Sequence, residues 1–452
     1  MTIAAISTAK APAGIGIVRL SGTDAIIMGE RFFSGRESLS DPANDRKLLY
    51  GHFVKDGEVY DEVLAVAFRG PRSYTGEDMV EIQAHGGSVG LERILSAFLE
   101  AGCVGATPGE FTKIAFLNGK LDLTEAEGIM DMIEAESVSA QKQGVRQLTG
   151  ALYRKIEGFR ASLKDTLAQL VAEIDFSTEE VEPVGVEVLI DTATKIREEM
   201  QRLLETFHRG KLVKEGIATA IVGKPNVGKS SFLNALLRED KAIVTEIPGT
   251  TRDVLEASYS LNGIHLRVQD TAGIRETEDV VEKLGIERAL KSMEDADLVI
   301  AIFDASNPLT ETDLKIIEGV RDKRALCLLN KRDLGSAVSA EEMEEYFPGA
   351  VIETSFREEE GLDAVEEKIE SWFLAGDIRT DDVFLTSLRH RDLLQAAIES
   401  LDKGIADLEA GVGLDLAEIY IEDAFAKLGE ITGQTADEEV LNHVFSKFCI
   451  GK

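Results

Sequence analysis

The chain is poor in cysteine. Its 452 residues include three cysteines, Cys103, Cys327 and Cys449, and no two of them are close enough in sequence to form a CxxC pair. This usage favours a reducing compartment and argues against a zinc site. Cys327 lies in an apolar run and is expected to be buried and inert, whereas Cys449 is either a reactive thiol or a core residue at a helix end.

Long hydrophobic runs are also missing. The longest, such as Leu298-Val-Ile-Ala-Ile-Phe303, are far shorter than the roughly 20 residues that span a bilayer. Lys10, Pro12 and Gly14 interrupt the first 22 residues, so they do not predict a signal peptide. We therefore expect a cytoplasmic protein without membrane contacts. The hydrophobic content of 44% is sufficient for real cores, and the length allows about three domains.

Positive charge is scarce. Lys and Arg number 49 against 82 Asp and Glu, which gives a net charge of −33. Nucleic-acid affinity depends mainly on phosphate contacts from Lys and Arg. No basic stripe, Arg-rich tail or RNA-binding motif is visible. If RNA is a substrate, we expect limited direct contact, with a partner protein supplying most of the basic surface.

A phosphate-binding P-loop is present at residues 223–230, Gly-Lys-Pro-Asn-Val-Gly-Lys-Ser. The apolar run 218–222 before it reads as a strand, and residues 231–237 after it read as a helix, which is the context that this motif requires. Backbone N–H groups and the helix N-terminus then face the phosphates. Lys229 is expected to reach the β- and γ-phosphates, and the Ser230 hydroxyl is expected to bind Mg²⁺.

The second nucleotide signature is Asp270-Thr-Ala-Gly273, which follows an alternating run that reads as a strand. The Asp270 carboxylate can hold a magnesium-bound water there. Gly273 lacks a Cβ, so its N–H can approach the γ-phosphate. Ile274 follows, where small GTPases usually carry a Gln that orients water, and no arginine finger is evident. A different group must therefore complete catalysis.

The third signature is Asn330-Lys-Arg-Asp333, which follows the apolar run 325–329. Asp333 can accept two hydrogen bonds from the guanine edge, and Asn330 can brace the loop. Adenine presents no such pair of donors, so it would leave Asp333 unpaired at a high cost. The three signatures together predict a chain that binds GTP and hydrolyses it.

Longer stretches resemble one family, the MnmE (TrmE) tRNA-modification GTPases. In the nucleotide-binding region the matching residues are Asn226, Ile247-Pro-Gly-Thr-Thr-Arg-Asp253, Asp270-Thr-Ala-Gly-Ile-Arg275 and Glu282. Elsewhere the matching blocks are residues 14–19, 74–78, 108–112 and 118–123 and the C-terminal Phe448-Cys-Ile-Gly-Lys452. The resemblance extends from about residue 3 to the last residue.

The resemblance implies how the missing catalytic groups are replaced. K⁺ would stand in for an arginine finger, bound by Asn226 and by the loop around Thr245, Ile247 and Thr250, and it would offset transition-state charge. Thr251 would complete the Mg²⁺ shell with Ser230. Glu282 would orient water, so that Lys229, Asn226 and Glu282 form the catalytic set. The alternatives are a solvated helix face for Glu282 and an ordinary turn residue for Asn226.

The predicted GTP site as a whole combines the motifs and the resemblance. It consists of Asn226, Val227, Gly228, Lys229, Ser230, Ser231, Thr245, Glu246, Ile247, Pro248, Gly249, Thr250, Thr251, Asp270, Thr271, Ala272, Gly273, Asn330, Lys331, Asp333 and Ser355. One departure concerns Phe356, which follows Ser355 where GTPases commonly place Ala beneath the base.

The resemblance also implies that the N-terminal domain binds a 5-formyl-tetrahydrofolate-type one-carbon donor. The matching positions are Arg19, Glu81, Lys120 and Lys452. Arg and Lys would pair with folate carboxylates, and Glu81 would meet pterin N–H donors. Each residue has an alternative as a surface ion-pair residue. Thr107 and Ile114 stand where some relatives carry Arg.

Three functional classes remain open at this point. The leading one is a homodimeric GTPase that modifies the wobble uridine of tRNA together with MnmG, which would bring the FAD. A GTPase switch in ribosome assembly, without chemistry of its own on RNA, is the second. A stand-alone folate enzyme with a regulatory G domain is the third.

The predicted fold is multidomain, α/β plus α, with a P-loop GTPase domain inserted into a discontinuous helical domain. The predicted segments are 1–118 (α+β, folate binding and dimerisation), 119–213 (helical), 214–376 (GTPase) and 377–452 (helical). Strands are expected at 15–20, 63–68, 218–222, 266–270, 298–303, 325–329 and 350–354. A helical stripe runs through Ile156, Phe159, Leu163, Leu167, Leu170 and Ile174. Thr435 and Glu438 predict a capping box for the last helix, whose stripe Val440, Leu441, Val444, Phe445 and Phe448 is expected to be core.

Overall fold

The computed structural model describes residues 1–9, 11–175, 185–238, 242–243, 257–261, 264–269, 293–358, 360–373 and 383–452. Contacts divide the chain into two compact units. The first consists of residues 1–130, 145–201 and 389–452, and the second of residues 131–144 and 202–388. Among the residues that the structure describes, no helix combines the length and the apolar composition that a membrane span requires.

A seven-stranded sheet forms the N-terminal part of the first unit, in the order β3-β4-β5-β6-β2-β1-β7. Its strands are β1 (Ile3–Ile6), β2 (Ala13–Ser21), β3 (Phe33–Gly35), β4 (Leu49–Lys55), β5 (Glu58–Phe68), β6 (Met79–Gly86) and β7 (Val104–Gly105). The strands expected at 15–20 and 63–68 are thereby confirmed. All neighbours pair antiparallel except β1 and β7, which pair parallel.

Two helices, α1 (Ala25–Phe32) and α2 (Ser88–Glu100), cover one face of this sheet. The rings of Phe32, Phe53 and Phe98 meet there at centroid distances of 5.3 to 5.4 Å. Because side chains alternate along a strand, Val18 and Leu20 point into this core, whereas Arg19 between them points to the other face. A short 3₁₀ turn, η1 (Pro42–Asn44), precedes β4.

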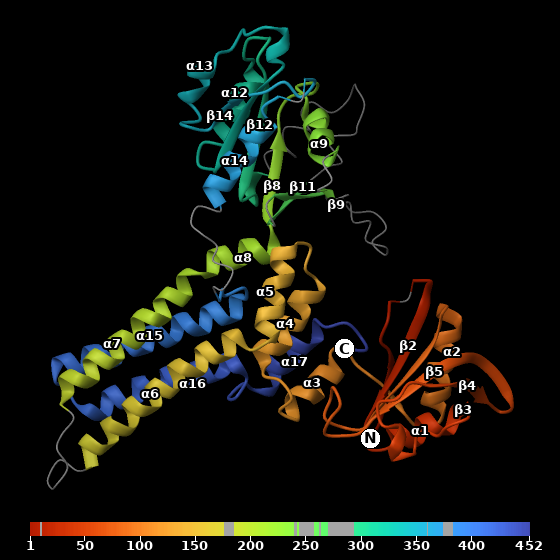
Figure 1. The fold of residues 1–452 in the computed structure, drawn as a ribbon. Helices are drawn as coiled ribbons and strands as arrows, with labels where there is room; N and C mark the ends of the chain where they lie inside the picture. Colours follow the sequence, from red (N-terminus) through yellow and green to blue (C-terminus); the bar gives the residue numbers. More distant parts are fainter. Residues whose placement is uncertain are drawn as a thin grey trace. The chain divides into compact units, whose positions relative to one another are not determined.

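The remainder of the first unit is helical. Its helices are α3 (Glu110–Leu117), α6 (Ala151–Asp175), α16 (Leu414–Thr432) and α17 (Glu438–Ser446), and α4 (Leu123–Ile133), α5 (Val138–Leu148), α7 (Val186–Glu205) and α15 (Leu388–Ala410) each have residues in both units. Figure 1 shows α6 and α16 side by side. The stripe expected on α6 is largely confirmed, with Ile156, Phe159, Leu163 and Leu170 buried and the other two half-buried.

The start of α17 differs from the prediction. Asp437, not Thr435, is the N-cap, and its carboxylate accepts a hydrogen bond from the Val440 N–H at 2.8 Å. The Thr435 hydroxyl donates instead to the Ala426 carbonyl at 3.1 Å. A carboxylate placed directly before the helix reaches these N–H groups, whereas Thr435 bonds to the end of α16. The predicted core stripe is confirmed, since Leu441, Val444, Phe445 and Phe448 pack with Leu123, Ala126 and Met130.

A buried ion pair ties α4 to α15. The Glu127 carboxylate accepts two hydrogen bonds from Arg389, at 3.0 and 2.8 Å, and lies 2.5 Å from the His390 Nε2. Arg389 also donates to the carbonyls of Glu430 and Ile431 at the end of α16. Burial alone would raise the pKa of the Glu127 carboxyl, but His390 and Arg389 outweigh it and hold that pKa below its usual range.

Glu127→Gln is expected to lower the free energy of unfolding by about 3 kcal/mol, because it leaves the Arg389 charge buried without a counter-charge. Since the folded-state pKa of Glu127 is lowered, its contribution is present above pH about 4.3 and is lost as the pH falls below that value. Urea unfolding at pH 7 and pH 3 measures both effects. The exposed Glu58, which pairs with Arg93, provides the control, since Glu58→Gln should cost under about 1 kcal/mol. Equal costs for the two variants would contradict this account.

The second unit is built on another seven-stranded sheet, in the order β14-β13-β12-β8-β11-β10-β9. Its strands are β8 (Ile217–Val222), β9 (Ala242–Ile243), β10 (Ala257–Leu261), β11 (Ile264–Gln269), β12 (Leu298–Asp304), β13 (Ala325–Asn330) and β14 (Val351–Glu353). All five strands expected in this region are confirmed. The sequence did not predict β9 and β10, which pair antiparallel at one edge and lack a long apolar run.

Helices surround this sheet, as Figure 1 shows for α9, α12 and α14. They are α8 (Phe207–Glu215), α9 (Lys229–Arg238), α12 (Glu311–Gly319), α13 (Ala340–Glu344) and α14 (Leu362–Phe373), with a 3₁₀ turn η2 at Arg332–Leu334. The predicted fold class is confirmed: a mostly parallel α/β unit with a P-loop, helical segments on either side of it in sequence, and an α+β N-terminal domain.

Candidate functional site

Three parallel strands, β8, β12 and β13, end at the same edge of the second sheet. Their register places Ala301 beside Val222 and Asp304 beside Asn330. The loops that follow these strands therefore meet, which is where α/β sheets bind ligands. The P-loop follows β8, and the Asn330–Asp333 motif follows β13.

The P-loop needs backbone conformations that favour glycine. Gly223 and Gly228 have φ of +153° and +111°, and Asn226 between them has φ of +63°. A Cβ on Gly228 would lie 2.2 Å from the Asn330 Nδ2, and one on Gly223 would lie 2.4 Å from the Ile302 carbonyl oxygen. Only residues without a side chain allow this close approach of the loop to β12 and to Asn330.

Asn330 connects the P-loop to the loop after β14. Its buried side-chain amide donates to the Val227 carbonyl at 2.7 Å and accepts from the Phe356 N–H at 3.1 Å. The Ser355 hydroxyl donates to the Asp333 carboxylate at 2.9 Å. Three segments distant in sequence are thus held together by side chains of the motif itself.

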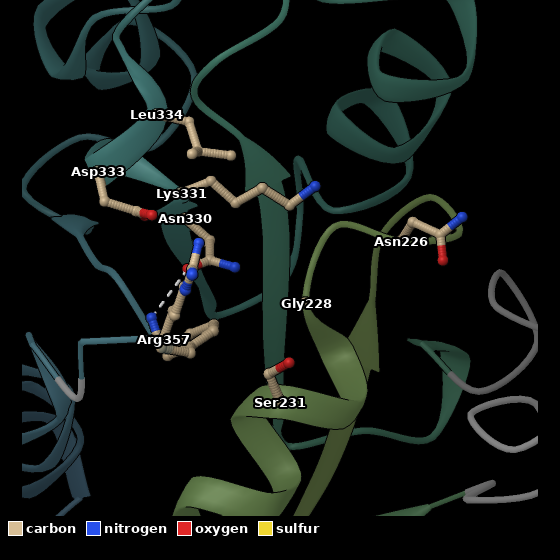
Figure 2. A pocket seen from close by; sticks show the side chains of 9 residues that line it. Asn226, Gly228, Ser231, Asn330, Lys331, Asp333, Leu334 and Arg357 are labelled. Atoms are coloured by element: carbon tan, nitrogen blue, oxygen red, sulfur yellow. Dashed lines mark hydrogen bonds between the residues drawn. The ribbon is translucent and has the colours of Figure 1, made fainter.

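A pocket of about 230 Å³ opens between these loops. Figure 2 shows Asn226 on one side of it and Lys331, Asp333 and Leu334 on the other. The pocket is lined by Asn226, Gly228, Ser231, Asn330, Lys331, Asp333, Leu334, Phe356 and Arg357. The sequence interpretation did not assign Leu334, Phe356 or Arg357 to the site, although Leu334 directly follows Asp333 and Phe356 directly follows Ser355, both of which it did assign.

Phe356 occupies the position where an Ala was expected. Its ring is buried and lies 5.1 Å from the ring of Phe232 in the first turns of α9. Its N–H bonds to Asn330, so the larger side chain packs inward without disturbing that link. The exposed apolar side chain of Leu334 lies at the pocket, where it can contact a flat base.

Lys229 lies at the start of α9, with Ser230 beside it. The Lys229 ammonium donates to the carbonyls of Gly223 and Lys224 at 2.6 and 2.7 Å. Burial lowers the pKa of Lys229 to about 8. A bound phosphate would supply the negative charge that favours the protonated amine.

We expect the affinity for GDP to depend on pH through Lys229. Below pH about 7 the amine is protonated before binding and the affinity is flat; above pH about 8 binding must take up a proton. The dissociation constant should therefore rise about tenfold between pH 7 and pH 9. Calorimetric titration with GDP measures it. Lys229→Arg is the control: the Arg side chain stays charged at every pH tested, so any pH dependence left in this variant comes from titration of the guanine base. The same pH dependence in both proteins would show that Lys229 is not its source.

Several predicted residues lie outside the described residues. These are Thr245, Glu246, Ile247, Pro248, Gly249, Thr250, Thr251, Asp270, Thr271, Ala272, Gly273 and Glu282. Of the predicted ion ligands, the structure describes Ser230, in the first turn of α9, and Asn226, at the pocket. A serine hydroxyl suits Mg²⁺, and an amide oxygen suits K⁺, so both residues fit the ions assigned to them.

A second candidate site lies in the first unit, on the sheet face opposite α1 and α2. Arg19 and Glu81 stand opposite each other on β2 and β6, with side-chain atoms 2.8 and 2.9 Å apart. Arg19 also donates to the Gly451 carbonyl at 3.2 Å, and its guanidinium lies over the rings of Tyr74 and Phe111. The pair is only 17% and 15% exposed, so it is better enclosed than an ordinary surface ion pair.

The chain terminus completes this site. The Phe111 N–H donates to the Lys452 carbonyl at 3.2 Å, and the Gly109 N–H donates to the Cys449 carbonyl at 3.4 Å. Lys452 is half-buried, and burial together with the nearby Arg19 lowers the pKa of its amine. The structure thus brings the block 108–112 and the C-terminal block together around Arg19.

The remaining predictions for this region have mixed outcomes. Lys120 donates to the Pro71 carbonyl at 2.9 Å. Cys449 is exposed, so its interpretation as a core residue was wrong; it follows the last turn of α17, whose apolar stripe ends at Phe448. In the second unit, Cys327 is buried in β13 as expected, and burial raises the pKa of its thiol. Thr107 bonds to Glu110, and Ile114 packs against a small apolar cluster.

Two family models match this chain, and together they extend over almost all of it. The family model for the MnmE helical domain matches residues 123–449, and that for the GTP-binding protein TrmE N-terminus matches residues 2–120. The tRNA modification GTPase MnmE of Finegoldia magna is 45% identical over 451 residues, covering 100% of this chain and 99% of its own. That of Alkaliphilus oremlandii is 43% identical over 456 residues, with the same coverage.

A solved structure, the G domain of the T. maritima FeoB iron transporter, is 28% identical and has a TM-score of 0.26, covering 34% of this chain and 96% of its own. The family models extend over both candidate sites, and the relatives align along the whole chain. The family expected from the motifs is confirmed, and the chain belongs to the MnmE (TrmE) tRNA modification GTPases.

Proposed function

We propose that this chain couples GTP hydrolysis to modification of the wobble uridine, position 34, of tRNA. As a member of this family it is a GTPase. The observation that carries the GTP-binding part of the proposal is the Asn330 side chain, which joins the P-loop to the loop that bears Ser355 and Phe356, and the tRNA part rests on the family. This link supports the proposal, because it joins the P-loop and the loop after β14 beside one pocket.

Phosphate binding falls to the P-loop in this proposal. Lys229 exchanges its two loop carbonyls for phosphate oxygens. Ser230, with Thr251, would hold Mg²⁺, and Asn226, with Thr245, Ile247 and Thr250, would hold K⁺. These ions supply positive charge that offsets the charge developing on the phosphates during hydrolysis. Glu282 would orient the attacking water, because Ile274 cannot.

Selection of guanine falls to Asp333. Its carboxylate is fixed by the Ser355 hydroxyl at the pocket and can accept hydrogen bonds from the guanine N1–H and exocyclic amine. Leu334 and the aliphatic part of the Lys331 side chain line the same part of the pocket and offer the base an apolar surface. Adenine would leave Asp333 without donors, so GTP is favoured over ATP.

The N-terminal site would hold a 5-formyl-tetrahydrofolate-type donor through Arg19, Glu81, Lys120 and Lys452. The enclosed Arg19–Glu81 pair and the adjoining C-terminal block support this assignment. In the proposed organisation, residues 1–118 bind folate and dimerise, 214–376 hydrolyse GTP, and 119–213 with 377–452 form the helical domain. The net charge of −33 supports tRNA contact mainly through the flavoprotein MnmG, which would bring the FAD.

Analysis of tRNA nucleosides from a strain lacking this gene tests the proposal. We expect loss of the carboxymethylaminomethyl-type group at C5 of the wobble uridine, restored by the wild-type gene but not by a Gly228→Ala copy. Normal wobble uridines with accumulating ribosomal subunits would favour the assembly switch instead. One-carbon turnover by the purified chain without any partner would favour the stand-alone folate enzyme.

A further inference from the structure

An ion pair ties the P-loop to α12, a helix that no nucleotide motif includes. The Lys224 ammonium lies 2.6 Å from the Asp313 carboxylate and donates to the Thr310 hydroxyl at 3.1 Å. Thr310 is the N-cap of α12, and its N–H and hydroxyl both donate to Asp313 at 2.8 Å. The third residue of α12 is thus bonded both to its own cap and to the P-loop.

Burial indicates that this is more than a surface contact. The side chain of Asp313 is 2% exposed and that of Lys224 is 21% exposed. Asp313 Oδ1 is buried and makes no hydrogen bond within the part of the chain that the structure describes. A carboxylate so enclosed needs a counter-charge, and Lys224 supplies it. A carboxylate that served the helix cap alone would not need to be buried against the P-loop.

The P-loop is held at two points as a result. Asp313 anchors residue 224 through its side chain, and Asn330 anchors the Val227 carbonyl. Between and beside these anchors lie three residues with positive φ, a conformation that persists only where the surroundings fix it. The Lys224 carbonyl itself accepts the Lys229 ammonium at 2.7 Å. A shift of residue 224 would therefore move a direct partner of the phosphate-binding lysine.

We propose that Asp313 is a positioning residue for nucleotide binding, acting through Lys224 on the P-loop. The proposal rests on the proposed GTP binding. In this proposal Lys224 holds the P-loop in position and does not bind phosphate, because Asp313 neutralises its charge. The competing interpretation makes Lys224 a second phosphate ligand that Asp313 restrains. The two interpretations predict opposite changes in nucleotide affinity for Asp313→Asn. If the ion pair positions the P-loop, the substitution weakens binding. If Asp313 restrains a phosphate ligand, the substitution frees the Lys224 ammonium for phosphate and strengthens binding.

Calorimetric titration with GDP in the full-length protein separates these possibilities. We expect Lys224→Met and Asp313→Asn each to weaken GDP binding about tenfold. The double variant should be within about twofold of either single variant, because both remove the same interaction. Lys224→Arg keeps the pair and should bind within about twofold of wild type. Lys315→Met, an exposed lysine on the same helix, is the matched control and should leave binding unchanged.

A pH series adds a readout that loss of stability alone would not change. In Lys224→Met the carbonyl of residue 224, which accepts from the Lys229 ammonium, is held less firmly, so the pKa of Lys229 moves down and GDP affinity begins to fall at a lower pH than in wild type. Lys224→Met leaves the cap of α12 intact, and far-UV circular dichroism checks that each variant is folded. Tighter GDP binding by Asp313→Asn, or wild-type affinity in both single variants, would overturn the inference. Failure of the wild-type protein to bind GDP would instead overturn the proposed function.

Discussion

Asp333→Asn is expected to reverse the preference between GTP and XTP. The carboxylate offers two acceptors to the guanine edge, whereas an Asn amide offers one acceptor and one donor. That combination suits xanthine, which carries a carbonyl where guanine carries an amine. Because sites that hydrogen-bond a substrate reject analogues by about 10⁴-fold, the ratio of kcat/KM for GTP over XTP should fall by about that factor. Steady-state hydrolysis of both nucleotides measures it.

Asp322→Asn provides the control for this prediction. Asp322 is exposed in the same unit, in the turn before β13, and does not line the pocket. Its substitution should leave both the GTP rate and the preference unchanged. If Asp333→Asn still hydrolyses GTP in strong preference to XTP, this carboxylate does not select guanine by hydrogen bonding, and the placement of guanine beside Ser355 would be wrong.

Gly228→Ala is expected to lower nucleotide affinity by at least about 100-fold. The new Cβ would lie 2.2 Å from the Asn330 Nδ2, at a backbone φ of +111° that L-residues rarely adopt. Either the P-loop or the Asn330 side chain must move, and both hydrogen bonds of that amide would be disturbed. Strain and a lost buried hydrogen bond together cost about 3 kcal/mol or more. Titration with GDP measures the loss.

Gly349→Ala is a matched control for that substitution. Gly349 also has positive φ, +64°, but a Cβ there would meet no atom within 4 Å. It precedes β14, so it lies at the sheet edge opposite the pocket. We expect a modest loss of stability and unchanged GDP affinity. Equal losses of affinity in the two variants would mean that strain alone, and not the contact with Asn330, accounts for the effect.

The nucleotide pocket shows which features a sequence reveals. The apolar runs 298–303 and 325–329 are buried strands, and the motifs follow strands at one edge because parallel topology places them there. The role of Phe356 was not predictable in this way. Its contacts are with Phe232 and Asn330, and no local pattern joins residues so far apart in the chain. The Lys224–Asp313 pair escaped notice for the same reason.

The N-terminal site shows the opposite case. Arg19 and Glu81 are 62 residues apart, and only the register of β2 and β6 makes them partners. Spacing carried no signal for them, so the family resemblance alone selected them. The N-cap predicted for α17 was wrong for another reason. Both Thr435 and Asp437 are good N-cap residues, and the hydrogen bond from the Thr435 hydroxyl to the Ala426 carbonyl of α16 leaves the capping role to Asp437.

Cation dependence tests the central claim most directly, since K⁺ is proposed to replace the arginine finger that the chain lacks. The measurement is the rate of GTP hydrolysis in KCl and in NaCl at matched ionic strength, for wild type and Asn226→Ala. The account predicts at least about tenfold faster hydrolysis in KCl for wild type, and a much smaller ratio for Asn226→Ala. Equal wild-type rates in the two salts would contradict it, remove K⁺ from the site and require that a partner supply the missing catalytic group.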